Sequence, residues 1–172
     1  TMQSVMNLKI KYRESFRPFA PSVLAERVAD YFELEHSSPY MLLVADVKEE
    51  RRLPQPSKDG MPMLERLKVN RSDIPAVTHL DYSARLQSVN KKDKPDYHAL
   101  ISAFERLTGC AVIVNTSFNV RGEPIVCTPE DAYRCFMSTE MDYLVIENCF
   151  LSKAEQPAEN RDRNWIADLA SD

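Results

Sequence analysis

The spacing of apolar and polar residues predicts a chain in which strands and helices alternate. Apolar side chains alternate with lysines over residues 7–12, which is the period of a strand with one buried face. Continuous apolar runs over residues 40–47 and 111–114 predict two further strands. After the first strand, Ser22 is expected to cap a helix whose apolar stripe is formed by Leu24, Val28, Tyr31 and Phe32.

The second half of the chain carries helix boundary signals. Pro95 opens a helical pattern that Gly109 closes, as is usual for prolines at the first helical position and glycines after the last. The apolar face of this helix is expected to comprise Tyr97, Leu100, Ile101, Phe104 and Leu107. Thr128 and Asp131 surround Pro129 in a capping-box-like arrangement, so a second helix is expected to begin there.

Short strands complete the expected sheet. Residues 76–80 and 85–89 predict a hairpin around a turn at 81–83, and residues 143–146 and 149–151 predict two more strands. Strands that alternate with helices, together with one hairpin, are typical of an α/β domain with a mixed sheet.

The chain is expected to form a single domain over residues 1–153, with a long excursion and a polar tail. Proline, glycine and charged residues dominate residues 48–75 without a sustained period, which indicates a surface loop or a lid. Residues 154–172 form the polar tail, with Trp165 as its aromatic anchor. Strand-like residues begin almost at once, which suggests a chain cut from something longer.

Composition and charge narrow the function classes. A chain of 172 residues with 44% hydrophobic and 28% charged residues is typical of a soluble globular protein, and its apolar runs are too short to cross a membrane. A net charge of −4 argues against a broad nucleic-acid-binding surface. The four cysteines lack metal-ligand spacing and have apolar neighbours, so we expect reduced core residues and a cytoplasmic protein.

Cations and small polar residues follow or end three of the expected strands. The three groups are Lys11, Arg13 and Arg17; His79, Ser83 and Arg85; and Ser117, Asn119 and Arg121. A strand would present Lys11 and Arg13 on one face, where they can neutralise a polyphosphate or, alternatively, only guard an exposed sheet edge.

Two residues of the second group have competing interpretations. Arg85 lies among apolar and small residues, where an arginine needs an anionic ligand or an internal partner such as Glu14 or Glu123. His79 and Asp81 are two residues apart and can face one another as an oriented base. A structural histidine is the simpler interpretation, because no nucleophile is identifiable beside it.

The stretch 115–126 concentrates hydrogen-bonding groups directly after a buried strand. It offers small polar side chains, a forked cation and a glycine, in Asn115, Ser117, Asn119, Arg121 and Gly122. This pattern predicts a phosphate or carboxylate site, with an ordinary turn as the alternative. The sequence has three glycines and no glycine-rich phosphate loop, so any nucleotide would be held by side chains.

Residues 11–24, 77–85 and 115–129 closely resemble the C-terminal domain of NodU/CmcH-type carbamoyltransferases, and the resemblance covers about residues 5–153. It implies a YrdC-like domain, with a twisted mixed α/β sheet and a basic concave face. In that family, as the resemblance implies for this chain, the C-terminal domain takes carbamoyl phosphate and ATP, releases phosphate and makes carbamoyl adenylate. The resemblance also implies a separate N-terminal ASKHA-type domain, which holds the metal and passes the carbamoyl group to a hydroxyl acceptor.

The Lys-x-Arg and Ser-x-Asn elements that mark YrdC-like domains match residues 11–13 and 117–119. By this resemblance, the catalytic cations that bind phosphate are Lys11, Arg13, Arg85 and Arg121. The other substrate- or nucleotide-binding residues are His79, Ser83, Asn115, Ser117 and Asn119. Mg²⁺ is expected to arrive on the ATP phosphates, with no metal site in this domain.

Two other functions fit the same residues. A threonylcarbamoyl-adenylate synthase shares both elements and would use bicarbonate and threonine. A catalytically silent module would instead bind nucleotide and dock on an ASKHA-type partner. No nucleic-acid or membrane partner is expected, and a homodimer stays open.

Overall fold

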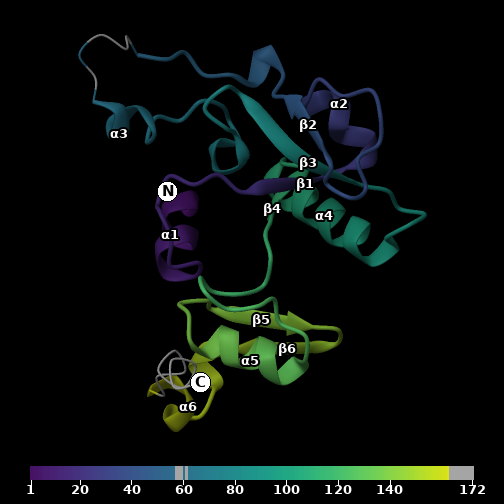
Figure 1. The fold of residues 1–172 in the computed structure, drawn as a ribbon. Coiled ribbons are helices and arrows are strands. Elements are labelled where there is room, and N and C mark those ends of the chain that lie inside the picture. The colour runs from purple at the N-terminus through teal and green to yellow at the C-terminus, as the bar shows by residue number, and fades with distance from the viewer. Residues whose placement is uncertain (57–59, 61, 163–172) are drawn as a thin grey trace. The chain divides into compact units, whose positions relative to one another are not determined.

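The computed structural model of the protein describes residues 1–56, 60 and 62–162. The chain divides into two compact units, which we describe separately. The central unit comprises residues 18–116, and the terminal unit joins residues 1–17 to the chain from residue 117 onward. Both units combine strands with helices, so the expected α/β class is confirmed (Figure 1).

The central unit is built on a four-stranded mixed sheet in the order β2-β3-β1-β4. Its strands are β1 (Ala20–Leu24), β2 (Leu43–Asp46), β3 (Ser83–Val89) and β4 (Val112–Asn115). β1 pairs in parallel with β3 and antiparallel with β4, while β2 pairs antiparallel with β3. The mixed sheet is therefore confirmed.

One long helix and several short ones accompany this sheet. The helical segments are η1 (Ala25–Arg27), α2 (Val28–Tyr31), η2 (Glu49–Arg51), α3 (Met63–Arg66), η3 (Pro75–Val77) and α4 (Pro95–Thr108). The predicted ends of α4 are confirmed, with proline at its start and Gly109 in the left-handed conformation at its end. No helix in the described ranges combines the length and apolarity needed to cross a membrane.

The predicted apolar face of α4 is only partly buried. The helix contacts β1 and β4, and the residues that it buries are His98 and Ile101. Leu100 and Leu107 are 59% and 86% exposed. The helical period was thus correct, but only a narrow side of the helix packs against the sheet.

Two predictions in the central unit are wrong. Ser22 lies inside β1 instead of capping a helix, and the helical turns begin only at Ala25, although all four predicted stripe residues are buried. Residues 76–80 form no strand, because Pro75 begins a 3₁₀ turn there. The predicted hairpin is therefore replaced by longer-range pairing of β3 with β1 and β2.

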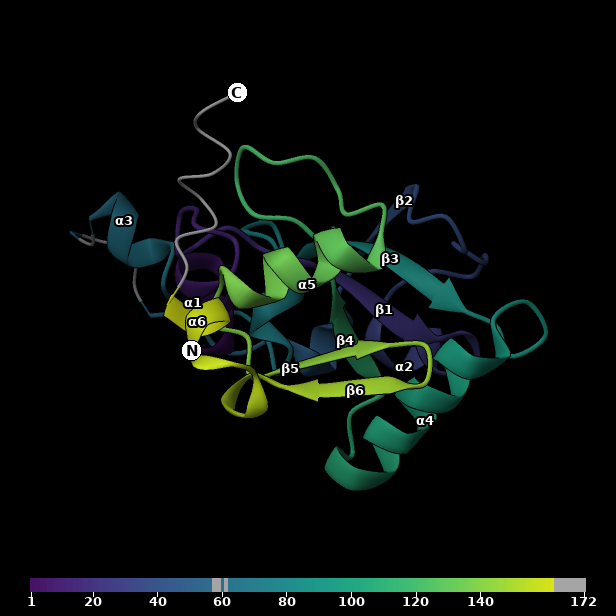
Figure 2. The same cartoon turned by 90° about the horizontal axis from the view of Figure 1, so that it is seen from below.

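The terminal unit packs a helix on a β-hairpin. Its elements are α1 (Met2–Lys9), α5 (Pro129–Met137), β5 (Tyr143–Ile146), β6 (Cys149–Ser152), η4 (Lys153–Glu155) and α6 (Ala158–Asp162). β5 and β6 pair antiparallel, as predicted, and α5 runs alongside them (Figure 2). Phe136, Met137 and Leu144 form the buried core between helix and hairpin.

The strand predicted over residues 7–12 is wrong, because the chain forms helix α1 up to Lys9. Thr1 caps this helix by accepting a hydrogen bond from the Ser4 N–H. Asn7 is fully buried and Leu8 is 55% exposed, which is the reverse of the expected pattern. The alternation of apolar and polar residues gave the wrong prediction because the buried residue is Asn7, a polar side chain whose hydrogen bonds are satisfied inside the protein.

The remaining expectations concern the excursion, the tail and the cysteines. Residues 48–75 include η2, α3 and a β-bridge between Arg52 and Ser72, and Trp165 lies outside the described residues.

All four cysteines are thiols, but only Cys135 is buried, so the prediction of four core cysteines is wrong. Burial raises the pKa of Cys135 to about 11, which keeps it protonated at neutral pH.

The predicted capping box of α5 is confirmed and should contribute stability that depends on pH. The Asp131 carboxylate accepts hydrogen bonds from the backbone N–H groups of Cys127 and Thr128, at 3.3 and 3.1 Å. These bonds lower the pKa of Asp131 from 3.8 in the folded state. Their contribution is therefore present above pH 3.8 and is lost as the pH falls through the lowered folded-state pKa.

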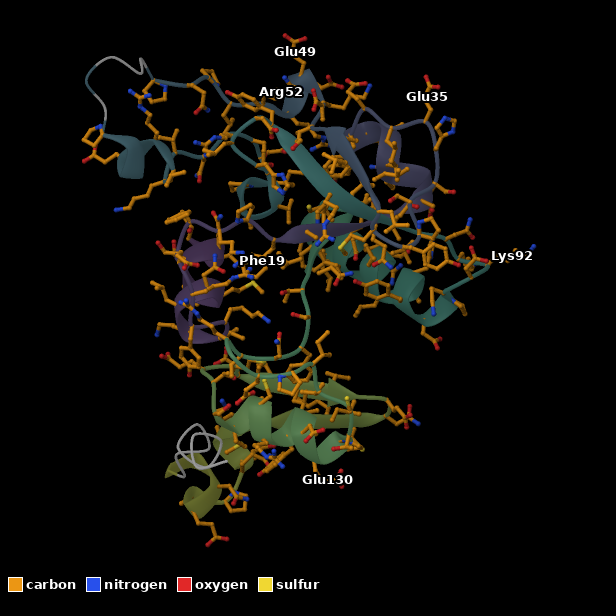
Figure 3. The ribbon with its side chains drawn as sticks, in the orientation of Figure 1. Phe19, Glu35, Glu49, Arg52, Lys92 and Glu130 are labelled. Atoms are coloured by element: carbon orange, nitrogen blue, oxygen red, sulfur yellow. The ribbon has the colours of Figure 1, made fainter. Side chains whose placement is uncertain are left out.

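We expect Asp131→Ala to lower the melting temperature at pH 7, with a smaller difference from wild type well below pH 3.8. Thermal unfolding followed by circular dichroism across this range measures the effect. Glu130→Ala is the matched control, because Glu130 projects outward from the same helical turn (Figure 3). A melting-temperature difference that stays constant with pH would contradict the assignment.

Candidate functional site

A cavity of about 210 Å³ in the terminal unit gathers most of the predicted cations. We call it the basic pocket, and its lining residues are Lys11, Arg13, Glu14, Arg17, Ser117, Asn119, Val120, Arg121 and Gly122. Four cationic side chains face one carboxylate, so the pocket carries a local positive charge on a chain of net negative charge. This excess of positive charge suits an anionic ligand.

Lys11 is a buried lysine that hydrogen-bonds the segment 117–119, which forms one wall of the basic pocket. Its side chain is 6% exposed, and its ammonium donates to the carbonyl oxygens of Ser117 and Asn119 at 2.8 and 2.7 Å. It also donates to the Asn119 Oδ1 atom at 2.7 Å. Burial, followed by the charge of Arg13, lowers the pKa of Lys11. The lysine thus holds residues 117–119 in place and supplies charge behind them.

Arg13 enters the pocket from a turn, although a strand was predicted. Tyr12, between the two cations, has a φ of 48°, in the left-handed region that strands exclude. Arg13 donates through Nε to Asn7 Oδ1 at 2.6 Å, while the Asn7 amide donates to the Arg17 carbonyl at 2.7 Å. The buried Asn7 therefore fixes the turn that carries Arg13 and Arg17.

Arg121 lies at the exposed rim of the basic pocket. Its side chain is 69% exposed, and its guanidinium is 3.8 Å from the carboxylate of Glu14, which is itself half exposed. Such a long, solvated ion pair holds the arginine weakly. Gly122 follows with a φ of 88°, so the backbone turns directly after the cation.

The remaining predicted residues lie in the central unit, where His79 precedes β3 and the other three, Ser83, Arg85 and Asn115, lie on strands of the sheet. Residues two apart on a strand share a face, so Ser83, Arg85 and Gln87 project from the same side of β3. Ser22 on β1 and Asn115 on β4 join Gln87 through side-chain hydrogen bonds of 2.9 and 2.8 Å. We call this set, namely Ser22, Ser83, Arg85, Gln87 and Asn115, the polar sheet face.

Arg85 is the cation of the polar sheet face. Its side chain is exposed and makes no ion pair or hydrogen bond with any described residue of the central unit. An arginine in a strand without such a partner is available to an anionic ligand.

His79 and Asp81 meet through a serine and not directly. The Ser83 hydroxyl donates to Asp81 Oδ1 at 2.7 Å and lies 3.2 Å from His79 Nδ1. Because the only hydroxyl proton goes to the carboxylate, the Ser83 oxygen is the acceptor in its contact with His79, and Nδ1 carries the shared proton. The bonds from Ser83 lower the pKa of Asp81.

Three residues of these sites escaped the sequence interpretation. Asn7 was assigned to a strand, Ser22 to a helix cap, and Gln87 was not selected. A signal for Gln87 was present, because it continues the period of two set by Ser83 and Arg85. No local pattern identified Asn7, whose partners lie 6–10 residues along the chain.

The sites fit phosphates better than a metal held by the protein. Within the described ranges, no cluster of three or more histidine, cysteine, aspartate or glutamate side chains could hold a metal ion. The basic pocket offers one carboxylate, Glu14, against four cations.

Comparison with known proteins identifies relatives over nearly the whole chain. The family model described as carbamoyltransferase C-terminus matches residues 1–153. A protein of Synechocystis sp. is 64% identical over 173 residues, which cover 100% of this chain and 28% of the relative. The nodulation protein NolO of Bradyrhizobium diazoefficiens is 37% identical over 169 residues, covering 96% of this chain and 27% of NolO.

A relative with a named reaction is also similar. The 3'-hydroxymethylcephem-O-carbamoyltransferase of Amycolatopsis lactamdurans is 31% identical over 147 residues, which cover 86% of this chain and 24% of that enzyme. The chain thus spans about a quarter of the length of the curated relatives that it matches.

Proposed function

This chain belongs to the carbamoyltransferase C-terminus family, and from that premise we propose that it binds carbamoyl phosphate and ATP and forms carbamoyl adenylate. The observation that carries the proposal is the basic pocket, in which four cations line a cavity of about 210 Å³. Both ligands are phosphate anions, which lysine and arginine recognise by charge-assisted hydrogen bonds.

The proposed reaction consumes water and proceeds in two steps. Water cleaves carbamoyl phosphate to carbamate and inorganic phosphate. A carbamate oxygen then attacks the α-phosphorus of ATP, and the bond to the bridging oxygen breaks to release pyrophosphate. Carbamoyl adenylate, phosphate and pyrophosphate are the products, so neither step requires a nucleophile from the protein.

The protein's part in this chemistry is positioning and charge stabilisation. Arg121 and Arg13 would contact the phosphoryl oxygens, where negative charge develops as the leaving group departs. Lys11 would add its charge from behind residues 117–119, whose conformation it holds. When bound, Mg²⁺ supplies further charge neutralisation on the ATP phosphates.

The acceptor half of the reaction is assigned to another part of a longer protein. The relatives are about four times as long as the region matched, and the family description places that region at the C-terminus. We propose that an N-terminal ASKHA-type domain receives carbamoyl adenylate and transfers the carbamoyl group to a hydroxyl acceptor.

Product analysis with the natural full-length protein tests the proposal. Incubation with carbamoyl phosphate and ATP, without an acceptor, should yield phosphate and pyrophosphate in equal amounts, and mass spectrometry should detect carbamoyl adenylate. Replacing carbamoyl phosphate with bicarbonate and threonine should yield no pyrophosphate. Turnover with the second substrate pair alone would identify a threonylcarbamoyl-adenylate synthase. ATP binding without either product would identify a silent nucleotide-binding module.

A further inference from the structure

Glu14 is the carboxylate of the basic pocket, which otherwise gathers four cations. A hydrogen bond from its own backbone N–H and the charge of Arg121 lower the pKa of Glu14, so the side chain is ionised at neutral pH. An ionised carboxylate repels the phosphate ligands that the surrounding cations attract. Its position in this pocket therefore costs affinity for any ligand that consists of phosphate alone.

An ion pair with Arg121 does not account for this carboxylate. The two charged groups are 3.8 Å apart, and the side chains of Arg121 and Glu14 are 69% and 47% exposed. Ion pairs of such length and exposure contribute little to stability. Among the residues that the structure describes, no other side chain makes an ion pair or a hydrogen bond with the Glu14 carboxylate. Its oxygens are therefore accessible to a ligand.

The backbone around Glu14 is ordered by the buried Asn7. The Asn7 amide donates to the carbonyl oxygens of Ser15 and Arg17, at 3.3 and 2.7 Å. The Asn7 carbonyl oxygen accepts from the Arg13 N–H at 2.9 Å. The Glu14 carbonyl oxygen accepts from the Arg17 N–H at 3.1 Å. These bonds hold the residues on both sides of Glu14, so an ordered turn presents the carboxylate to the pocket.

A phosphate that binds Arg121 comes close to Glu14. A phosphate oxygen about 2.8 Å from the guanidinium lies within about 7 Å of the carboxylate, because the two side chains are only 3.8 Å apart. Two anionic groups at this range repel each other unless a cation lies between them. Mg²⁺ is usually bound by one or two carboxylates together with substrate phosphates and waters. Glu14 beside a phosphate site therefore fits the Mg²⁺ of a nucleotide, although it could not hold the ion without the phosphates.

We propose that the Glu14 carboxylate ligates the Mg²⁺ ion that ATP carries into the basic pocket. This assignment rests on the proposed function and names the residue that distinguishes the magnesium complex of ATP from metal-free phosphates. The arginines of the pocket contact phosphate oxygens, and Glu14 contacts the ion. Carbamoyl phosphate without a metal ion gains nothing from the carboxylate.

Calorimetric titration of the natural full-length protein and its Glu14→Gln variant tests this assignment. The ligands are ATP with excess magnesium chloride, ATP with EDTA, and carbamoyl phosphate with EDTA. Glutamine keeps the size of the side chain and removes its charge. Glu14→Gln should bind the magnesium complex about tenfold or more weakly, because a charge-assisted contact is lost. It should bind metal-free ATP and carbamoyl phosphate at least as tightly as wild type does, because a repulsive charge is removed.

Loss of the fold and loss of the metal contact give different results. An unfolded variant would bind all three ligands more weakly, whereas the assignment requires weaker binding of the magnesium complex alone. Glu130→Gln is the matched control, because Glu130 is an exposed carboxylate at the start of α5 that does not line the basic pocket. It should bind all three ligands as wild type does in the same buffers. Circular dichroism verifies the fold of each variant.

The outcomes separate this assignment from the function on which it rests. Tighter or unchanged binding of the magnesium complex by Glu14→Gln would overturn the assignment, limit Glu14 to the charge balance of the pocket and leave the proposed function standing. Equal weakening of all three ligands in a folded Glu14→Gln protein would also overturn it, because the effect would not depend on the metal. Binding of neither ATP nor carbamoyl phosphate by wild type would contradict the proposed function itself.

Discussion

Replacing Lys11 with methionine is expected to lower the free energy of unfolding by about 2–4 kcal/mol, because the carbonyl oxygens of Ser117 and Asn119 lose the charged donor of a buried lysine. The lysine ammonium contacts oxygens of both Ser117 and Asn119, more than 100 residues away in the chain. Its removal should release this segment and weaken the binding of carbamoyl phosphate and ATP by about 100-fold or more, since charge and pocket shape are lost together. Denaturant unfolding and calorimetry measure the two effects.

Lys9→Met provides a matched control two residues earlier. Lys9 is half exposed and pairs with Glu140 at the surface, so its removal should change neither stability nor ligand binding appreciably. The account of Lys11 would be contradicted by a Lys11→Met protein with wild-type stability and affinity. Reduced stability with unchanged affinity would assign the lysine a structural role only.

Replacing Arg121 with alanine should reduce turnover without reducing stability. The arginine is 69% exposed, and its contact with Glu14 at 3.8 Å is too long and solvated to stabilise the fold. In the proposed reaction it faces the charge that develops on phosphate oxygens, so its loss should raise the barrier by about 3–4 kcal/mol, or about 10²–10³-fold in kcat. Pyrophosphate release by the natural full-length protein measures this effect.

Arg106→Ala serves as the control for Arg121→Ala, because Arg106 is an exposed arginine in the last turn of α4, outside both sites. It should retain wild-type turnover. If Arg121→Ala unfolds at the wild-type temperature and releases pyrophosphate at the wild-type rate, Arg121 has no part in the reaction.

Sequence reasoning succeeded where the signal is local. Pro95 and Gly109 mark the ends of α4, and Thr128 with Asp131 marks the start of α5, because these residues act on neighbouring backbone groups. The hairpin of β5 and β6 was also found, since its strands are adjacent in the chain.

Sequence reasoning failed where distant contacts decide the structure. The alternation over residues 7–12 resembles a strand, but a buried network around Asn7 supports a helix and a turn instead. β3 pairs with β1, more than 60 residues earlier, and not with residues 76–80 beside it. Local period and propensity do not report such pairings.

For the candidate site too, the sequence identified the residues but not the contacts that they make with distant parts of the chain. The cations were identified by residue type and by resemblance, and the structure brings four of them to one cavity. The roles within the site depend on partners far apart in the sequence. Lys11 holds residues 117–119, and Asn115 is oriented by Ser22 and Gln87.

The most direct test of the central claim is calorimetric titration of the wild-type chain and of Arg121→Ala with carbamoyl phosphate and with ATP. We predict that wild type binds both ligands and that the folded variant binds at least one of them about tenfold or more weakly, as expected for a lost charge-assisted contact. Absence of binding by wild type, or equal affinities in the two proteins, would contradict the basic pocket as the site for these phosphates.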